Sequence, residues 1–307
     1  MKRKTLICVV GPTAVGKTEI AIELAQWVNA EILSADSRQF YKEMEIGTAK
    51  PDSSELDAAK HHFINNLSIQ DTYDVGLYEE QVLTKLDELF LNNDFAILVG
   101  GSGMFVDAIC QGLDQFPDVP IEIREQLKKE LNSKGIEPLQ KELKLSDLDY
   151  YQEVDRNNPQ RVIRALEVIR TTGQKFSSFR KGSVIERPFN TVKIGLEMDR
   201  EKLYERINLR MDLMIQAGLF EEAESLIEHR SLNALQTVGY REIFGCLDGD
   251  YDKEEAIRLL KRNSRRYAKR QMTWFKRDEE TSWFNPSQSE EIKSYLKSKL
   301  ELSITKD

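Results

Sequence analysis

The sequence is poor in cysteine and has no long apolar run. Its 307 residues include three cysteines, Cys8, Cys110 and Cys246, which are spaced too widely to predict a disulfide framework or a zinc site. Such usage fits a reducing cytosol. No stretch approaches the roughly 18 apolar residues of a membrane span, and the apolar run near the N-terminus is too short for a signal peptide. We therefore expect a soluble, cytoplasmic protein.

Positive charge is also in deficit. Lys and Arg number 44 against 52 Asp and Glu, which gives a net charge of −8. Taken alone, this excess argues against a nucleic-acid partner. Salt screens exposed charges beyond about 10 Å, however, so a local basic cluster matters more than the total. The distribution of Lys and Arg along the chain therefore has to decide.

What the sequence does contain is a series of short apolar segments in its first third. Three of them predict buried strands: Thr5–Val10, Glu31–Ala35 and Phe95–Val99. Residues 18–28, between the first two, have apolar side chains at helical spacing. Alternating apolar residues predict a further strand at 191–198. Strands that alternate with helices predict a parallel α/β sheet.

The middle of the chain, residues 115–189, shows no convincing strand. Asn158 is a suitable helix cap, Pro159 suits the first helical turn, and Gly173 ends the apolar stripe that follows. After residue 198 the chain is expected to be mostly helical. The sequence thus predicts an α/β core formed by residues 1–114 and 190–307, with a helical insertion domain at 115–189.

A glycine-rich segment after the first predicted strand matches the pattern G-x-x-x-x-G-K-[ST]. It consists of Gly11, Pro12, Thr13, Ala14, Val15, Gly16, Lys17 and Thr18. With a strand before it and a helix after it, the segment predicts a phosphate-binding P-loop, in which Lys17 supplies a cation and the Thr18 hydroxyl can bind Mg²⁺. The motif indicates a polyphosphate ligand without identifying it, and ATP is the first candidate.

An acidic residue is missing where P-loop ATPases commonly have one. The strand at Phe95–Val99 runs directly into Gly100-Gly101-Ser102-Gly103, which offers one hydroxyl and no carboxylate. This turn favours close approach of a ligand over nucleotide hydrolysis. An acid does follow the second predicted strand: Asp36 lies at its end, where α/β sheets bind their ligands. Position alone leaves three roles open for Asp36: general base, metal ligand or helix cap.

Basic residues gather near the C-terminus. Nine of the 20 residues from Arg258 to Arg277 are Lys or Arg, and none is acidic. On a helix, one face would carry Arg258, Arg262, Arg265, Arg266, Lys269 and Lys276. Such a face predicts polyanion binding, although neighbouring acids could also balance it. Two arginine pairs, Arg161 with Arg164 and Arg206 with Arg210, are spaced to share helix faces.

Together these segments resemble the tRNA dimethylallyltransferase family, also called the isopentenyl-tRNA transferases. The resemblance rests on seven blocks in the family's order, which span most of the chain: GPTAVGKT at 11–18, ADSRQFY at 35–41, IGTAKP at 46–51, GGSG at 100–103, NNPQRVIRALE at 157–167, TVGYRE at 237–242 and AKRQMTWFKR at 268–277. It implies transfer of a dimethylallyl group from dimethylallyl diphosphate to N6 of the adenine 3′ of the anticodon in tRNA, with release of diphosphate.

The resemblance also implies residue roles. Asp36 corresponds to the general base, Ser102 to a hydroxyl at the reacting centre, and Arg210 to the arginine that holds the diphosphate. The P-loop would then grip the diphosphate leaving group, with Mg²⁺ as cofactor. The positions implied to hold the tRNA anticodon stem-loop are Asp36, Ser37, Arg38, Gln39, Arg124, Gln160, Arg161, Val162, Ile163 and Arg164. We expect a monomer.

Three positions depart from the family's commonest pattern. Ser102 replaces Thr, Phe105 replaces Tyr, and Glu242 stands where Gln is common, which affects details of positioning. No zinc-finger extension like that of eukaryotic relatives is present, so the chain resembles the bacterial type. Two other functions remain as alternatives: a small-molecule kinase on a P-loop scaffold, and an RNA-binding module switched by a nucleotide.

Overall fold

The computed structural model describes residues 4–182 and 184–300. It divides the chain into two compact units, one formed by Met1–Cys110 with Arg187–Asp307 and the other by Gln111–Glu186. The insertion predicted from the sequence was 115–189. Among the residues described, no helix is both long and apolar enough to cross a membrane.

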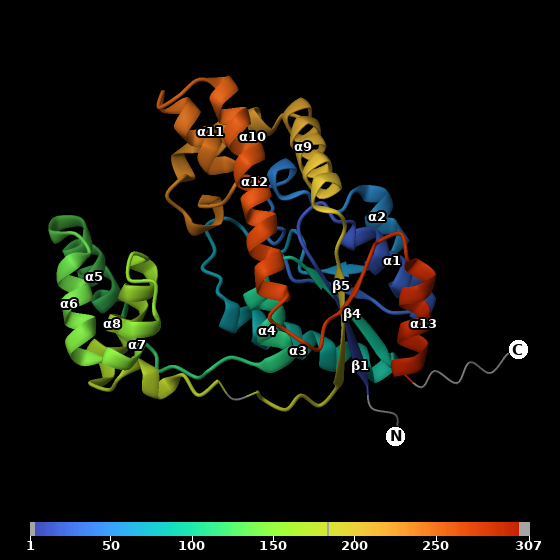
Figure 1. Ribbon diagram of the computed structural model, residues 1–307, viewed down its shortest axis with the longest axis horizontal. Helices are drawn as coiled ribbons and strands as arrows, with labels where there is room; N and C mark the ends of the chain where they lie inside the picture. Colours follow the sequence, from blue (N-terminus) through green and yellow to red (C-terminus); the bar gives the residue numbers. More distant parts are fainter. Residues whose placement is uncertain (1–3, 183, 301–307) are drawn as a thin grey trace, which may run out of the picture. The chain divides into compact units, whose positions relative to one another are not determined.

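The larger unit is built on a parallel sheet (Figure 1). Within the described residues the sheet has six strands in the order β3-β2-β4-β1-β5-β6. Four strands confirm the predicted ones: β1 (Thr5–Val10), β2 (Ile32–Ser34), β4 (Phe95–Gly100) and β5 (Asn190–Leu196). The sequence did not predict the edge strands β3 (His61–His62) and β6 (Ser282–Phe284). Apart from β6, the described chain after residue 198 is mostly helical, as predicted.

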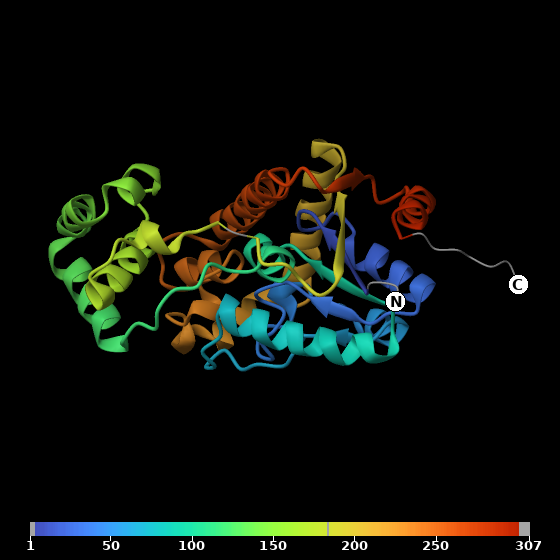
Figure 2. The same cartoon turned by 90° about the horizontal axis from the view of Figure 1, so that it is seen from below.

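Helices cover both faces of this sheet. Side chains alternate along β1, so Ile7 and Val9 pack on one face with α1 (Lys17–Val28), α9 (Arg200–Gln216) and α13 (Ser289–Lys299). Leu6 and Cys8 pack on the other face against α3 (Val75–Asn92) and α4 (Gly103–Gln111). Figure 2 shows α3 and α13 on opposite sides of the strands. Both faces of β1 are therefore buried, as its continuous apolar run requires.

A second apolar cluster forms beyond the carboxyl ends of the strands. It joins the C-terminal half of α9 to α10 (Leu219–Ser225), α11 (Tyr240–Leu247) and the start of α12 (Lys253–Phe275). Tyr240, which is fully buried, lies in this cluster. The short helix α2 (Ser53–Ala58) and the 3₁₀ turn η1 (Ile46–Thr48) follow β2. Helix α12 starts in this helical cluster, with Leu260, and ends against the sheet, with Phe275.

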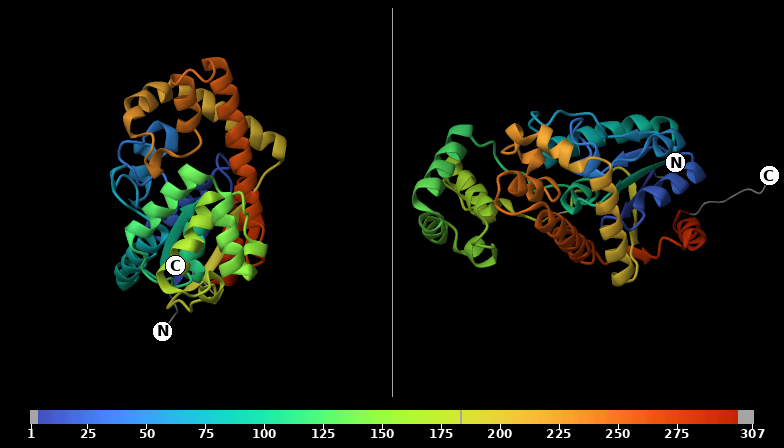
Figure 3. Two further views of the ribbon diagram at one scale, coloured as in Figure 1. Left: turned by 90° about the vertical axis from the view of Figure 1, so that its left-hand side faces the viewer. Right: turned by 90° about the horizontal axis from the view of Figure 1, so that it is seen from above.

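The smaller unit is helical, as predicted (Figure 3). It contains α5 (Ile121–Lys134), α6 (Glu137–Ser146), α7 (Leu148–Glu153) and α8 (Pro159–Thr172) around a core of their apolar faces. Asn158 caps α8, since its side chain accepts hydrogen bonds from the amides of Gln160 and Arg161. Gly173 ends the helix in the left-handed conformation, with φ of 68°. The predicted start and stop signals of this helix are thus confirmed.

Candidate active site

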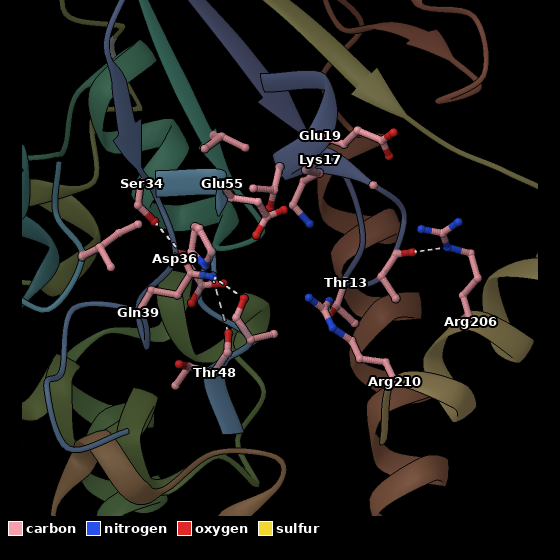
Figure 4. Close-up of a pocket in the computed structure, with 18 of the residues that line it drawn as sticks. Thr13, Lys17, Glu19, Ser34, Asp36, Gln39, Thr48, Glu55, Arg206 and Arg210 are labelled. Carbon is pink, nitrogen blue, oxygen red and sulfur yellow. Dashed lines mark hydrogen bonds between the residues drawn. The ribbon is translucent and has the colours of Figure 1, made fainter. Parts of the chain in front are cut away.

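Three loops meet at the carboxyl ends of adjacent strands in the larger unit. The P-loop follows β1, residues 35–39 follow β2, and residues 101–103 follow β4. Residues of the P-loop, the loop after β2 and the end of β4 enclose a cavity of about 500 Å³ together with α9 and α12. Ser102 is not among the residues that line this cavity. Figure 4 shows Asp36, Gln39 and Glu55 on one wall, Arg206 and Arg210 on the other, and Lys17 between them.

The P-loop has the curled backbone that its glycines allow. Gly16 has φ of 109°, a conformation that residues with a side chain rarely adopt. The Nζ of Lys17 donates to the carbonyl of Pro12 at 2.8 Å, and the Nε of Arg206 donates to the carbonyl of Ala14 at 2.8 Å. Thr18 also lines the cavity. The loop is therefore closed on itself and tied to α9.

Two cations of this cavity are desolvated. Burial lowers the pKa of Lys17 to about 8, against the opposing effect of the Asp36 carboxylate. Burial also lowers the pKa of Arg210, whose Nη1 lies 3.4 Å from the Thr13 hydroxyl. Neither cation forms an ion pair with any described residue. Cations withdrawn from water without an ion-pair partner are costly, so the cavity is suited to a ligand that brings several negative charges.

Asp36 faces these cations from the end of β2. Its Oδ1 accepts a hydrogen bond from the amide of Arg38 at 3.0 Å. Its Oδ2 accepts no hydrogen bond from the described part of the chain. No helix begins at this position, so the carboxylate caps a turn with one oxygen and presents the other to the cavity. This geometry favours a chemical role over the helix-cap alternative.

Ser102 lies beside the same turn. Its Oγ accepts from the amide of Ser37 at 3.0 Å and lies 3.2 Å from the Ser37 hydroxyl. Tyr267 of α12 lines the cavity. Burial, together with the Asp36 charge, raises the pKa of Tyr267 to about 12, so its hydroxyl stays protonated. Gly100 permits this packing, because a Cβ there would come within 2.2 Å of the Ala35 carbonyl oxygen.

The turn at Ile46–Thr48 forms another wall and is held from two sides. Glu222 accepts hydrogen bonds from the amides of Glu45, Ile46 and Gly47 at 2.7–2.9 Å. The side chain of Gln39 donates to the Thr48 and Ala49 carbonyls. Gln39 was predicted to hold tRNA, and the structure shows that its amide group also supports this wall.

A smaller cavity of about 90 Å³ adjoins the main one. It shares Asp36, Arg210 and Tyr267 with the main cavity and has an apolar side lined by Ile207, Met211, Met214, Leu219 and Val238. The methionines and aliphatic residues offer a deformable surface to an apolar group. The combined site thus places an apolar subsite next to two cations and a carboxylate.

The remaining predicted tRNA contacts lie in the smaller unit. Gln160 and Arg161 are exposed at the start of α8. Arg124 forms a bidentate ion pair with Glu167, at 2.6 and 3.0 Å, and Arg164 lies 3.5 Å from the same carboxylate. Glu167 is only 1% exposed, so it orients both arginines.

Val162 and Ile163 correct the prediction of tRNA contacts. They are 0% and 8% exposed and belong to the core of the smaller unit. Their side chains pack between helices, so only their backbone atoms are left for a contact with RNA. The block that resembles the family therefore contains both surface and core residues, since consecutive positions of a helix face different directions.

The basic segment forms helix α12, as predicted, but its face is only partly free. Arg258, Lys261 and Lys276 form ion pairs with Glu255, Asp212 and Glu197. By contrast, Arg266, Lys269 and Arg270 are exposed and form no ion pair with the described residues. Of the predicted face, Arg258 and Lys276 are therefore neutralised, whereas Arg262, Arg265, Arg266 and Lys269 form no ion pair with the described residues.

Sequence reasoning missed several residues of the site. Gln271 and Tyr267 line the main cavity from α12, and Glu55 lines it from α2. The signal that could have found Gln271 is its place among the buried positions of α12, where a polar side chain needs a partner.

The chain is similar to the members of one protein family over most of its length. The model of the IPP transferase family matches residues 39–278. The chain is 51% identical over 298 residues to the tRNA dimethylallyltransferase of Cytophaga hutchinsonii, which covers 97% of this chain and 98% of the relative. It is 49% identical over 300 residues to tRNA dimethylallyltransferase 1 of Bacteroides fragilis, and the alignment covers 98% of this chain and 100% of the relative.

Solved structures give the same result. The tRNA isopentenylpyrophosphate transferase of Bacillus halodurans superposes with a TM-score of 0.73 at 37% identity, over 97% of both chains. A eukaryotic dimethylallyltransferase acting on tRNA superposes with a TM-score of 0.79 at 25% identity, over 99% of this chain and 81% of that one. Sequence and fold therefore agree on the proteins that this chain resembles.

Proposed function

Because this chain belongs to the IPP transferase family, we propose that its cavity binds dimethylallyl diphosphate and presents it to an adenine of tRNA. The chain is a prenyltransferase that modifies tRNA, as its relatives are named. The observation that best supports the finer assignment is that Lys17 and Arg210, two partly buried cations without an ion-pair partner among the described residues, line one cavity with the Asp36 carboxylate. These comparisons do not favour the kinase alternative.

The chemistry follows from this arrangement. The adenine N6 forms a bond to C1 of the dimethylallyl group, while the bond from C1 to the diphosphate oxygen breaks and leaves its electron pair on the oxygen. Lys17, Arg210 and the P-loop amides stabilise the charge that develops on the diphosphate. Asp36 accepts the N6 proton. The dimethylallyl group occupies the apolar subsite lined by Met211 and Met214.

Mg²⁺ fits this site as a partner of the diphosphate. Among the described residues no group of three or more His, Cys, Asp or Glu side chains could hold a metal by itself. Mg²⁺ commonly takes one or two protein ligands and completes its shell with phosphate oxygens and water. The Thr18 hydroxyl, which lines the cavity, would supply the protein ligand. When bound, the ion would neutralise charge on the leaving group.

The acceptor is a base of a tRNA anticodon loop in this proposal. Such a base must leave its stack to enter a cavity. The target amine is N6 of the adenine 3′ of the anticodon.

The direct test is to mix dimethylallyl diphosphate labelled in its carbon chain with unmodified tRNA and Mg²⁺. We expect label in the RNA, at an N6-substituted adenosine after digestion, and one diphosphate released per group transferred. The proposal would be contradicted if the label stayed in unreacted dimethylallyl diphosphate while the enzyme phosphorylated a metabolite or hydrolysed ATP. A tRNA with guanine at the target position serves as the control.

We also predict that the arginines of α8 contribute to tRNA affinity. Replacing Arg161 and Arg164 by Gln should weaken tRNA binding and reduce the dependence of log K on log[salt] by about 0.7–0.9 for each phosphate that an arginine no longer neutralises. Binding titrations at low and at near-physiological salt measure both effects. The matched control replaces Lys128 and Lys129, two exposed cations of α5 in the same unit. An unchanged salt slope in the arginine variant would exclude these side chains as phosphate ligands.

A further inference from the structure

One side chain of α12 connects two loops of the active site. The Oε1 of Gln271 accepts a hydrogen bond from the amide of Thr13 in the P-loop at 2.8 Å. Its Nε2 donates to the carbonyl of Gly101, next to Ser102, at 2.9 Å. Gln271 is 5% exposed, so water does not compete for these hydrogen bonds. A single buried amide group therefore spans the loop after β1 and the turn after β4.

The two partners of Gln271 belong to different halves of the proposed reaction. Thr13 lies beside Arg210 on the side of the diphosphate leaving group. Gly101 precedes Ser102, whose Oγ accepts from the amide of Ser37 next to Asp36, on the side of the acceptor base. We infer that Gln271 is a positioning residue for the transfer, which sets the separation between the leaving-group half and the acceptor half of the site. This inference rests on the proposed function.

Only an amide of this length satisfies both hydrogen bonds. A backbone N–H must donate and a backbone carbonyl must accept, so the polarity of both partners is fixed. Glu lacks the donor for Gly101, and Met lacks both groups. Asn has the right groups but is one methylene shorter, and cannot reach both loops at once. The chemistry of the two hydrogen bonds thus selects Gln.

The Gln271 amide group packs tightly against the turn that contains Gly101. A Cβ at Gly101 would come within 2.3 Å of the Gln271 Nε2. The absence of a side chain at Gly101 therefore lets the amide approach the turn. Gln271 also uses the Thr13 amide, which leaves the amides further along the P-loop for the diphosphate. The connection fixes the position of the loop without a covalent link.

The role predicts an effect on the chemical step more than on substrate binding. In Gln271→Asn and Gln271→Met, Lys17, Arg210 and most P-loop amides remain, so the KM for dimethylallyl diphosphate should change by less than about threefold. The rate of the transfer step should fall by about 10²-fold, because a misplacement of about 1 Å can have that effect. Single-turnover transfer of labelled dimethylallyl diphosphate to saturating tRNA measures this step.

The experiment separates a positioning role from a purely structural one. Activities are corrected for the folded fraction from thermal unfolding, and Thr273→Val, on the exposed side of α12, is the control. The variant Gly101→Ala should also slow transfer, because its Cβ displaces the amide. The double variant Gly101→Ala with Gln271→Asn should then be no slower than the slower single variant, since both changes break the same connection.

Three outcomes would overturn the inference. The first is a single-turnover rate within about twofold of the unmodified enzyme in both Gln271 variants. The second is a reduction in rate that disappears on correction for the folded fraction. The third is a double variant whose rate reduction is the product of the two single reductions. If the unmodified enzyme transfers no label to tRNA, the proposed function fails, which is a different result.

Discussion

Replacing Asp36 by Asn should lower the rate of transfer by about 10²–10⁴-fold, the usual contribution of a positioned base, while tRNA still binds. The N6 amine of adenine is a weak nucleophile, and in the proposed mechanism its proton passes to the Asp36 carboxylate, whose Oδ2 accepts no hydrogen bond from the described residues. Asn keeps an oxygen that can accept from the amide of Arg38, as Asp36 does at 3.0 Å. The turn at 36–39 should therefore survive.

Single-turnover transfer and a tRNA-binding titration, run on the same preparation, measure the two halves of this prediction. Asp57→Asn, which removes an exposed acid of α2, is the matched control. A titration with Mg²⁺ tests the other role that the sequence left open for Asp36. If the carboxylate were a metal ligand, added Mg²⁺ would restore much of the rate. A rate within about threefold of the unmodified enzyme would remove Asp36 from the chemistry altogether.

The sequence predicted the long central strands of the sheet but not its edges. Buried strands such as β1 and β4 are continuous apolar runs, and such runs are visible without any knowledge of their neighbours. The edge strands β3 and β6 have two and three residues, all partly exposed. Segments this short and half-exposed have no periodic pattern, so only their pairing with a neighbouring strand reveals them.

The site shows a similar division. The P-loop and Asp36 are recognisable because their motif is local and lies at strand ends. Gln271 is not, because it lies 170 residues from Gly101 along the chain and its partners are backbone atoms. A backbone amide or carbonyl is present at nearly every residue, so the sequence does not show which of them Gln271 binds.

Family resemblance was least reliable within a single helix. It assigned Gln160 to Arg164 to tRNA as one block, although Val162 and Ile163 are core residues. The apolar stripe of α8 had already indicated that these positions face inward. Where a block of similarity and a helical pattern disagree, the pattern decides which side chains are available.

Lys17 should make the use of dimethylallyl diphosphate dependent on pH. Burial lowers the pKa of Lys17 to about 8, so in the empty enzyme its charge is present below pH 8 and disappears as the pH rises above it. Since kcat/KM reports the ionisation of the free enzyme, kcat/KM should fall above about pH 8. Saturating diphosphate favours the charged form, so kcat should vary less over the same range.

Substitutions of Lys17 isolate this effect. Lys17→Met should lower kcat/KM by about 10²–10³-fold, which is typical for loss of one group that stabilises developing charge, and should remove the decline above pH 8. Lys17→Arg should also remove the decline, because a guanidinium stays charged, although its different shape should reduce the rate. Ionisation of the diphosphate itself is common to all three proteins and cancels in the comparison. A decline that persists in Lys17→Arg would assign it to another group.

The same burial has a consequence for stability that activity measurements do not share. Because the pKa of Lys17 is lower in the folded enzyme than the usual 10.5, the unfolded chain binds more protons between about pH 8 and 10.5. The contribution of Lys17 to the free energy of unfolding therefore rises with pH in this window and is least favourable below it. Lys17→Met should then unfold at a higher temperature than the unmodified enzyme at pH 7, and this difference should shrink as the pH rises above 8 and disappear only above about pH 11. If Lys17→Met is both more stable and less active, the Lys17 charge destabilises the empty enzyme and serves to bind the ligand.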